Sequence, residues 1–600
     1  MWKKLCAAAA VLLAAIALIW LLIPKRQIPS VLESLRTEPD DADAWDNVIA
    51  YVPLDDRTDN LEDVIYLAEA SGYRVVLPPG DSYCTKLDGQ APNSSGSQYG
   101  DRETLFQWVQ DMENRGCNLY LLSLDQMFSG GLVNSRSVSE PADLVFADGT
   151  VMSETEAFDK FIFALSQNSE NHIYLFDSVV RLASTVGYQG FDLTEYYALR
   201  LYGMEARPTL EGEALTLENV FAAYPYGADG VTPAQENMEA AYRANLTDEM
   251  IAGYLGVRMR KLRLTDYVIS ALKTASYNNI HLLIGIDDSS NTTNIQYNEL
   301  RYIAKQAGRG STLLTGLDSL ARLLVGQIAR DRYDRQVKTY LRYIGGSQSV
   351  PSSEYDLYTL EKTVDLHMDL FQAQRVPEAE AELQLLVMTA PDDPAKAQDY
   401  CEELVSQLEY NAQKRIPTIL LEASNNAYGD LLEDMLLERA DFANLLAFAG
   451  KYDQANVTGA AFAMGFSRYL YLACREEKDA ACDIAQVRQM ANSMALTYPY
   501  ILHTRQELNQ FIELLRGNYN NLLPNRIRDK LVQRKLEQAF LPRCEKVLDN
   551  LRGTRLITSL APYEEKEIGD VSIRDPYFPW NRTFELSFTI DVAPLTPVEQ

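Results

Sequence analysis

The feature that most constrains the fold is the alternation, between residues 47 and 421, of short apolar runs with longer segments of helical periodicity. The runs have the length and the Val, Ile and Leu content of buried strands, and the segments between most of them space apolar residues by three and four positions. Strands that alternate with helices are typical of βαβ units and of a parallel sheet. We therefore predict an α/β fold, either a parallel β/α barrel or an open doubly wound sheet. The nine expected strands lie at 47–53, 74–77, 118–123, 172–176, 280–286, 312–315, 337–344, 383–388 and 418–421.

The predicted α/β domain covers residues 47–460 and is joined to segments of a different character. An insertion is expected at about 184–246, where no clear strand pattern occurs. Residues 461–600 are expected to form a helical C-terminal region with a terminal β-strand tail, because apolar residues first recur at helical spacing and then alternate near the end. Residues 28–46 are polar and acidic, and we interpret them as a spacer.

The N-terminus carries an apolar run, residues 5–23, with cationic residues on both sides. About 20 apolar residues are enough to span a bilayer as a helix. The end of the run lacks the small residues of a signal-peptidase site, so residues 1–27 are predicted to form an uncleaved signal anchor. The expected localisation is the cell membrane, with a single transmembrane helix and an extracytoplasmic body.

Charge and composition exclude several classes of function. The net charge is -29, and such a chain is repelled by phosphate backbones, so we expect no nucleic-acid partner. The sequence has only 4 His and contains neither an HExxH helix nor a CxxC pair, so no metal-ligating residues are predicted. Any chemistry should therefore depend on carboxylates, arginines, asparagines and tyrosines.

Polar residues follow many of the expected strands. In parallel α/β folds the loops at the carboxyl ends of the strands build the active site, so these residues are expected to converge on one cavity. A single Asp after a strand is also a common helix cap or turn residue, which is the structural alternative at each position. The candidate residues are Asp55, Asp56, Arg57, Asp125, Arg181, Asp287, Asp288, Asp318, Asn425 and Asn426.

Asp287 and Asp288 are the strongest catalytic candidates. They end the very apolar run 280–286, and a helix cap requires only one acid. Neighbouring strand residues point to opposite sides, so one of the two is expected to face the cavity. The remaining eight candidates are expected to bind substrate.

Three chemistries fit acids without histidine. The first is glycoside hydrolysis, in which one carboxylic acid protonates the leaving oxygen. The second is a hydrolase that holds Mg²⁺ or Ca²⁺ between clustered oxygens. The third is ligand binding alone, with Asp accepting from sugar hydroxyls and Arg57 or Arg181 binding a carboxylate. The leading prediction is a carbohydrate-active hydrolase that needs no cofactor and acts on a glycan or small sugar. The alternatives are a non-catalytic cell-envelope glycan-binding protein and the divalent-metal-dependent hydrolase.

Several sequence runs form a recognisable pattern, among them VPLDDR at 52–57, VLPP at 76–79, SLDQM at 123–127, GGLVNSR at 130–136, GIDD at 285–288 and GLD at 316–318. These runs resemble those of a bacterial family of unknown function, DUF4127. The resemblance extends in order from about residue 48 to about residue 590 and implies a long single-chain α/β fold, without an established activity. This chain departs from the family pattern at Thr58, Ser319 and residues 450–453, and the departures at Ser319 and 450–453 favour the glycan-binding alternative.

Overall fold

The computed structural model describes residues 45, 47–138, 143–274, 279–308, 310–450, 453–522 and 526–598. The signal anchor expected at residues 1–27 lies outside these ranges, as does nearly all of the expected spacer. Within the described ranges, no helix combines the length and the apolar character that crossing a bilayer requires.

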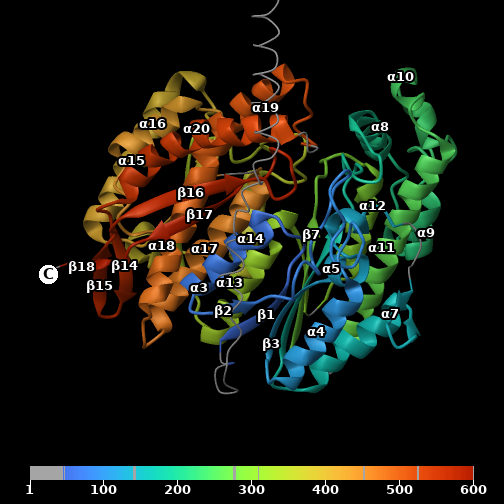
Figure 1. Ribbon diagram of the computed structural model, residues 1–600, viewed down its shortest axis with the longest axis horizontal. Helices are drawn as coiled ribbons and strands as arrows, with labels where there is room; N and C mark the ends of the chain where they lie inside the picture. Colours follow the sequence, from blue (N-terminus) through green and yellow to red (C-terminus); the bar gives the residue numbers. More distant parts are fainter. Residues whose placement is uncertain are drawn as a thin grey trace, which may run out of the picture.

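The chain forms two open parallel sheets (Figure 1). The first has the order β2-β1-β3-β6-β7-β8 and the second the order β10-β9-β11-β12-β13, and neighbouring strands are parallel throughout both sheets. The strands of the first sheet are β2 (Arg74–Val76), β1 (Val48–Val52), β3 (Leu119–Ser123), β6 (His172–Val179), β7 (Ile280–Ile286) and β8 (Ser311–Thr315). Those of the second are β10 (Gln374–Arg375), β9 (Lys338–Ile344), β11 (Leu383–Thr389), β12 (Thr418–Ala423) and β13 (Leu445–Ala449).

The predicted α/β class with parallel strands is confirmed. The nine expected strands are all present, but they divide between two open sheets instead of forming one barrel or one sheet. Two strands of these sheets, β10 and β13, were not predicted. The central strands are buried on both faces, which is why their sequences are continuous apolar runs and show no alternation.

Two helices join the sheets. Helix α13 (Leu320–Tyr333) packs against β6 and β7 of the first sheet, and α17 (Gln454–Cys474) packs against β12 and β13 of the second. The two helices also pack against each other. Helix α17 is apolar around nearly its whole circumference and is buried accordingly. The core is therefore continuous from one sheet to the other.

Gly465 allows α17 to approach β12 closely. A Cβ at this position would overlap Cδ1 and Cγ1 of the buried Ile419. We expect Gly465→Ala to lower the free energy of unfolding by about 1–3 kcal/mol, the usual cost of overpacking a core. The matched control is Gly253→Ala in the second turn of α11 (Asp248–Thr274), where a Cβ would meet nothing within 4 Å. That control should stabilise the protein by about 0.5–1 kcal/mol, and calorimetry that ranks the two variants the other way would contradict the packing argument.

The C-terminal region is helical at first and then forms strands. Its helices are α18 (Ala480–Ala495), the π-helical η10 (Leu496–Thr504), α19 (Arg505–Leu514) and α20 (Arg526–Leu551). The hairpin β16 (Val571–Tyr577) and β17 (Ser587–Val592) follows, so the strand expected at 584–592 is present. The loop between these two strands returns to the first sheet, where Thr58 Oγ1 donates a hydrogen bond to the Leu586 carbonyl (2.8 Å).

The segment expected as an insertion folds mainly into short helices. These are α8 (Leu193–Met204), α9 (Leu217–Ala223) and α10 (Ala240–Arg243), and they lie beside α11 and α12 (Ile295–Gln306) (Figure 1). The segment therefore extends the first-sheet side of the molecule.

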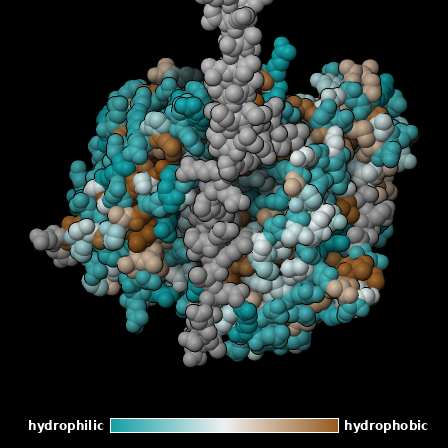
Figure 2. Space-filling model, in the orientation of Figure 1, coloured by the Kyte–Doolittle hydropathy of each residue, from teal (hydrophilic) through white to brown (hydrophobic). Residues whose placement is uncertain are grey.

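The face of the molecule in Figure 2 is mostly hydrophilic, and hydrophobic side chains form small separate areas on it. The most exposed large apolar side chains come from different parts of the chain, for example Leu514 at 82 % and Val231 at 76 %. This hydrophilic face agrees with the net charge of -29.

Candidate active site

The loops after β1 and β8 hold Arg57 between two carboxylates. The Arg57 guanidinium forms ion pairs with Asp55 (2.8 Å) and with Asp318 (2.6 Å). Asp55 is fully buried and also accepts a hydrogen bond from Asn60 Nδ2 (2.9 Å). The guanidinium lies 5.0 Å from the ring centroid of Trp580, which comes from the loop between β16 and β17. Three predicted residues therefore meet here.

Asp287 and Asp288, which follow β7, each face an arginine. Asp287 forms an ion pair with Arg136, which follows the short helix α6 (Leu132–Ser135). Asp288 forms a looser pair with Arg181 (3.3 Å). Each of these two carboxylates is therefore paired with a cation from another loop.

The charges of this edge act on one another. Burial lowers the pKa of Arg136 well below its usual value, and the positive charge of Arg181 lowers it further, while the charge of Asp288 opposes both effects. The loops after β1, β6, β7 and β8 thus form one cluster of alternating charges, as expected for the carboxyl edge of a parallel sheet.

Asp125 is predicted as a site residue but lies below the edge, in the interior. Its carboxylate binds the ammonium group of Lys261 from α11 (2.7 Å), and the same ammonium group is paired with Asp177. Asp177 also accepts a hydrogen bond from Thr265 Oγ1 (2.7 Å). All three charged groups are buried. We interpret this triad as part of the core.

Asp56 fastens the C-terminal loop to the first sheet. Its Oδ1 accepts hydrogen bonds from the Trp580 indole N–H (2.7 Å) and from the backbone N–H of Thr85 (3.0 Å). Burial raises the pKa of Asp56, and these two hydrogen bonds oppose that rise. The protein itself donates both of these hydrogen bonds to Asp56.

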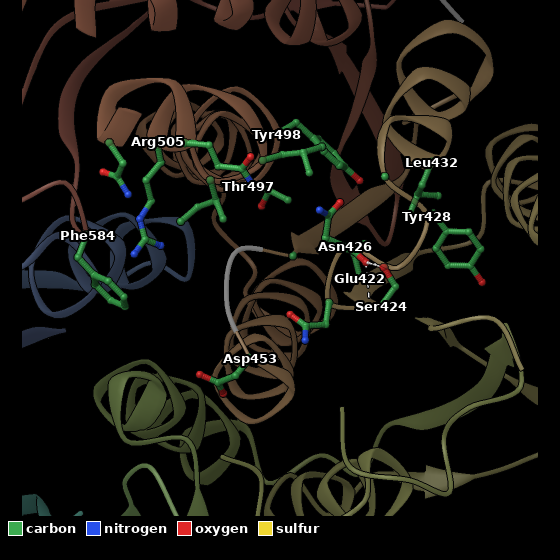
Figure 3. Close-up of a pocket in the computed structure, with 17 residues that line it drawn as sticks. Glu422, Ser424, Asn426, Tyr428, Leu432, Asp453, Thr497, Tyr498, Arg505 and Phe584 are labelled. Carbon is green, nitrogen blue, oxygen red and sulfur yellow. Dashed lines mark hydrogen bonds between the residues drawn. The ribbon is translucent and has the colours of Figure 1, made fainter. Parts of the chain in front are cut away.

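A cavity of about 460 Å³ opens at the carboxyl edge of the second sheet (Figure 3). Its walls come from the loops after β12 and β13, the start of α16 (Asp430–Arg439), η10, α19 and the loop before β17. Amide, hydroxyl and carboxyl side chains predominate among the residues that line it. These residues are Glu422, Ser424, Asn425, Asn426, Tyr428, Gly429, Leu432, Gly450, Asp453, Thr497, Tyr498, Ile501, Leu502, Arg505, Gln506, Asn509 and Phe584.

Glu422 is a carboxyl group in a buried strand. It lies near the end of β12 and is only 7 % exposed. Burial raises its pKa, and hydrogen bonds from the hydroxyl and backbone N–H of Ser424 oppose this rise. Among the side chains that Figure 3 labels, Glu422 and Ser424 lie side by side at the cavity wall.

Asp453 is the second carboxyl group of the cavity. It caps the N-terminus of α17 by accepting hydrogen bonds from the backbone N–H groups of Ala455 and Asn456 (both 3.1 Å). Burial raises its pKa to about 6; the Asn456 N–H opposes the rise, and the negative charges of Asp356 and Asp288 add to it. Asp453 therefore exchanges its proton close to neutral pH.

Asp453 also connects the cavity to the charge cluster of the first sheet. A second, much smaller pocket of about 30 Å³ is lined by Asp453 together with Asp287 and Asp288. Gly316 after β8 has φ +92° and lies so close to α17 that a Cβ would be 2.8 Å from the Ala455 carbonyl carbon. The carboxyl edges of the two sheets therefore meet at Asp453.

Arg505 and Phe584 form the opposite side of the cavity (Figure 3). The Arg505 guanidinium lies 4.4 Å from the centroid of the Phe584 ring, and Phe584 is 42 % exposed. Among the described residues, no carboxylate forms an ion pair with Arg505. An open aromatic ring beside polar groups offers a face for stacking and donors for oxygen atoms.

Apart from Asp125, which lies in the core, the predicted residues are divided between two places. Asn425 and Asn426 line the large cavity, whereas the acids after β1, β7 and β8 form the adjacent charge cluster. Sequence reasoning missed Arg136, Glu422 and Asp453. One signal was available for Glu422, because it is the only charged residue of an otherwise apolar strand.

Comparison with known proteins gives one result. A family described as "Protein of unknown function (DUF4127)" matches residues 49–589. Comparisons with curated proteins and with solved structures gave no match. The matched range contains every sequence run on which the resemblance depends, so that prediction is confirmed. The chain belongs to the family of proteins of unknown function DUF4127.

Proposed function

We propose that the protein is a carbohydrate-active hydrolase that works with carboxyl groups. The observation that carries this proposal is that Asp453 and Glu422, both with raised pKa values, line one cavity rich in amide and hydroxyl groups. Sites that bind sugars need such groups to accept from and donate to sugar hydroxyls. The predicted signal anchor would place the activity outside the cytoplasm.

Glycoside hydrolysis needs a protonated acid and a second carboxyl group in ionised form. We assign the acid to Asp453, because its pKa of about 6 leaves it partly protonated at mildly acidic pH. We assign the second role to Glu422, because it lines the same cavity and two hydrogen bonds from Ser424 hold its carboxyl group in place. The exposed ring of Phe584 would stack on a sugar face.

This assignment moves the acid role away from the adjacent pair predicted from sequence. The carboxylates of Asp287 and Asp288 are held in ion pairs with Arg136 and Arg181, and neither residue lines the large cavity. In the proposal Asp288 acts from outside the cavity, since its negative charge raises the pKa of Asp453.

The test is turnover by the full chain, purified in mild detergent because of the predicted anchor. A panel of aryl glycosides and cell-wall glycans is incubated with the protein, with and without EDTA, and products are identified by mass spectrometry. We expect product release that EDTA does not change and that Glu422→Gln abolishes. The matched control is Glu402→Gln on the exposed face of α15 (Ala397–Lys414), which should keep full turnover.

Two outcomes would contradict the proposal. A ligand-induced thermal shift without product would favour the glycan-binding alternative. Product release that EDTA abolishes and that Mg²⁺ or Ca²⁺ restores would favour the metal-dependent hydrolase.

A further inference from the structure

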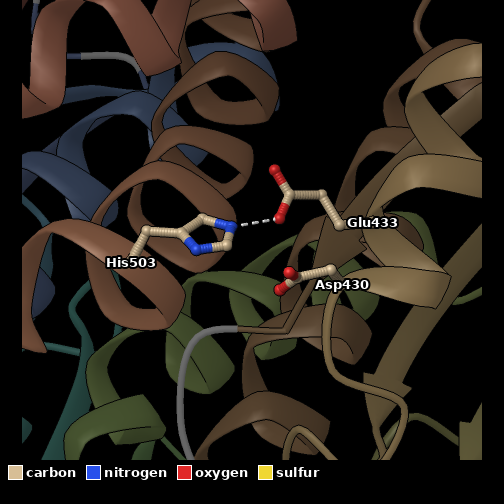
Figure 4. A group of neighbouring side chains, drawn as sticks. All are labelled: Asp430, Glu433 and His503. Carbon is tan, nitrogen blue, oxygen red and sulfur yellow. Dashed lines mark hydrogen bonds and ion pairs between the residues drawn. The ribbon is translucent and has the colours of Figure 1, made fainter.

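Three side chains with metal-ligating atoms meet on the outer side of the cavity wall (Figure 4). Asp430 and Glu433 lie one turn apart at the start of α16, and His503 lies near the end of η10. One ligand atom from each residue lies within 4.8 Å of the others. His503 Nε2 is 2.5 Å from Glu433 Oε2, so the imidazole already faces the carboxylates.

Local structure explains why these groups converge. Residues three apart on an α-helix share one face, so Asp430 and Glu433 present their carboxylates together. His503 comes from a π-helical segment, a rare conformation that is frequently found at functional sites. The imidazole therefore reaches the helix face from a different element, more than sixty residues later in the chain.

The imidazole of His503 is the partner that the described residues give to Glu433. Within the described ranges, neither Asp430 nor Glu433 forms an ion pair with a lysine or an arginine. Glu433 is 7 % exposed, and a buried carboxylate is costly unless a cation or donors compensate it. The neighbouring Asp434, in contrast, is paired with Lys546 (2.8 Å).

We infer that Asp430, Glu433 and His503 bind a divalent transition-metal ion, with Zn²⁺ the best match. The donor set is two carboxylate oxygens and one imidazole nitrogen. Mg²⁺ and Ca²⁺ take oxygen ligands, whereas imidazole suits Zn²⁺ and its neighbours in the first transition row. Three protein ligands leave one tetrahedral position for water, and the exposed Asp430 places the site next to solvent.

The site would link two walls of the cavity. Helix α16 contributes Leu432 to the lining, and η10 contributes Tyr498 and Ile501. An ion held by residues of both elements would fix their separation. Zn²⁺ binding should therefore stabilise the folded protein.

The experiment is Zn²⁺ titration of the full chain after EDTA treatment and dialysis, followed by calorimetry of binding and by thermal unfolding. We expect one Zn²⁺ ion per chain and a higher Tm with the ion than without it. His503→Gln and Glu433→Gln should each weaken binding at least about tenfold and remove the Tm increase. The matched control is Asp434→Asn, which removes the same charge from the same helix and should keep both effects.

Two outcomes would overturn the inference. The first is that the wild type does not bind Zn²⁺, and the second is that the wild type and His503→Gln bind Zn²⁺ with equal affinity. If a variant fails to fold without metal, Asp430→Asn replaces it, because Asp430 is exposed and its change leaves the core intact. Mg²⁺ alone in place of Zn²⁺ should give no Tm increase, and an equal increase would also overturn the inference. No readout uses turnover, so the result is independent of the proposed hydrolase.

Discussion

Asp453→Asn is expected to lower kcat/KM on any substrate identified by about 100- to 10,000-fold, the usual contribution of a general acid. Asparagine has nearly the same shape as aspartate and is an equally good N-cap residue, so the hydrogen bonds to the start of α17 are retained. What the variant lacks is the proton that the leaving oxygen must receive. The loss should therefore appear in turnover and leave the helix intact.

The dependence of kcat/KM on pH tests the assignment of Asp453 as the acid. The active form holds the proton on Asp453, so wild-type kcat/KM should fall as the pH rises through about 6. In Asp453→Asn this alkaline limb should be absent from the residual activity. A rate profile measured between pH 4 and pH 9 for both proteins would show the difference.

The stability of Asp453→Asn separates a catalytic effect from misfolding, because we expect the variant to lose turnover without losing stability. Because the folded-state pKa of Asp453 lies above its unfolded value of about 4, the native state gains stability as the pH falls through about 6. Above that pH the wild type holds an ionised carboxylate in a partly buried position. Asp453→Asn should therefore unfold at an equal or higher temperature than the wild type at pH 8, although its turnover is much lower.

The matched control for Asp453 is Asp479→Asn. Asp479 caps α18 by accepting from the Ala481 N–H (2.9 Å), so the same chemical change occurs at the same helix position, away from the cavity. This control should keep wild-type turnover and its pH profile. If Asp453→Asn keeps more than half of wild-type turnover, the acid is a different residue.

Much of the fold could be predicted because it depends on local patterns. Each of the nine expected strands is a run of buried apolar residues, and burial on both faces makes such runs easy to recognise. The missed strand β13 has the sequence LLAFA, whose two alanines favour a helix as much as a strand. The missed strand β10 has two residues, too few for any pattern.

The division into two sheets could not be predicted, since it depends on which strand lies beside which. Strand β8 is the edge of the first sheet, and the chain then passes through α13 to begin the second at β9. No property of the run 337–344 distinguishes a seventh strand of one sheet from the first of another. The pairing is visible only in the structure, where α13 and α17 pack against each other between the two sheets.

The site was predictable where one sheet edge creates it. The contact of Arg57 with Asp318, 261 positions apart, follows from the rule that parallel strands end at the same edge. The large cavity does not follow from that rule, because its walls include η10, α19 and the loop before β17. Asp125 shows the opposite error: it follows a strand, but a lysine from a distant helix holds it in the core.

The replacement of Lys261 is expected to have the largest effect on stability. Lys261→Met should lower the free energy of unfolding by about 3–5 kcal/mol, the cost of leaving a buried charge without its partner. Methionine fills the space of the side-chain stem but cannot compensate Asp125 and Asp177, both of which are 0 % exposed. Chemical denaturation of the full chain at pH 7 measures the change. The matched control is Lys273→Met on the same helix, whose exposed amine only donates to Gln306 (3.0 Å) and which should change stability by less than about 0.5 kcal/mol.

The dependence on pH and the rescue of the variant test the reason for the loss. Burial already raises the pKa of Asp177, and the Lys261 charge opposes that rise, so its removal raises the pKa further. Carboxyl groups with folded-state pKa values above their unfolded values stabilise the native state as the pH falls, so Lys261→Met should recover part of its loss between pH 7 and pH 5. Adding Asp125→Asn and Asp177→Asn should restore stability at pH 7, since no unpaired charge is then buried. If the triple variant is as unstable as Lys261→Met alone, the loss comes from packing around the lysine stem and not from the two carboxylates.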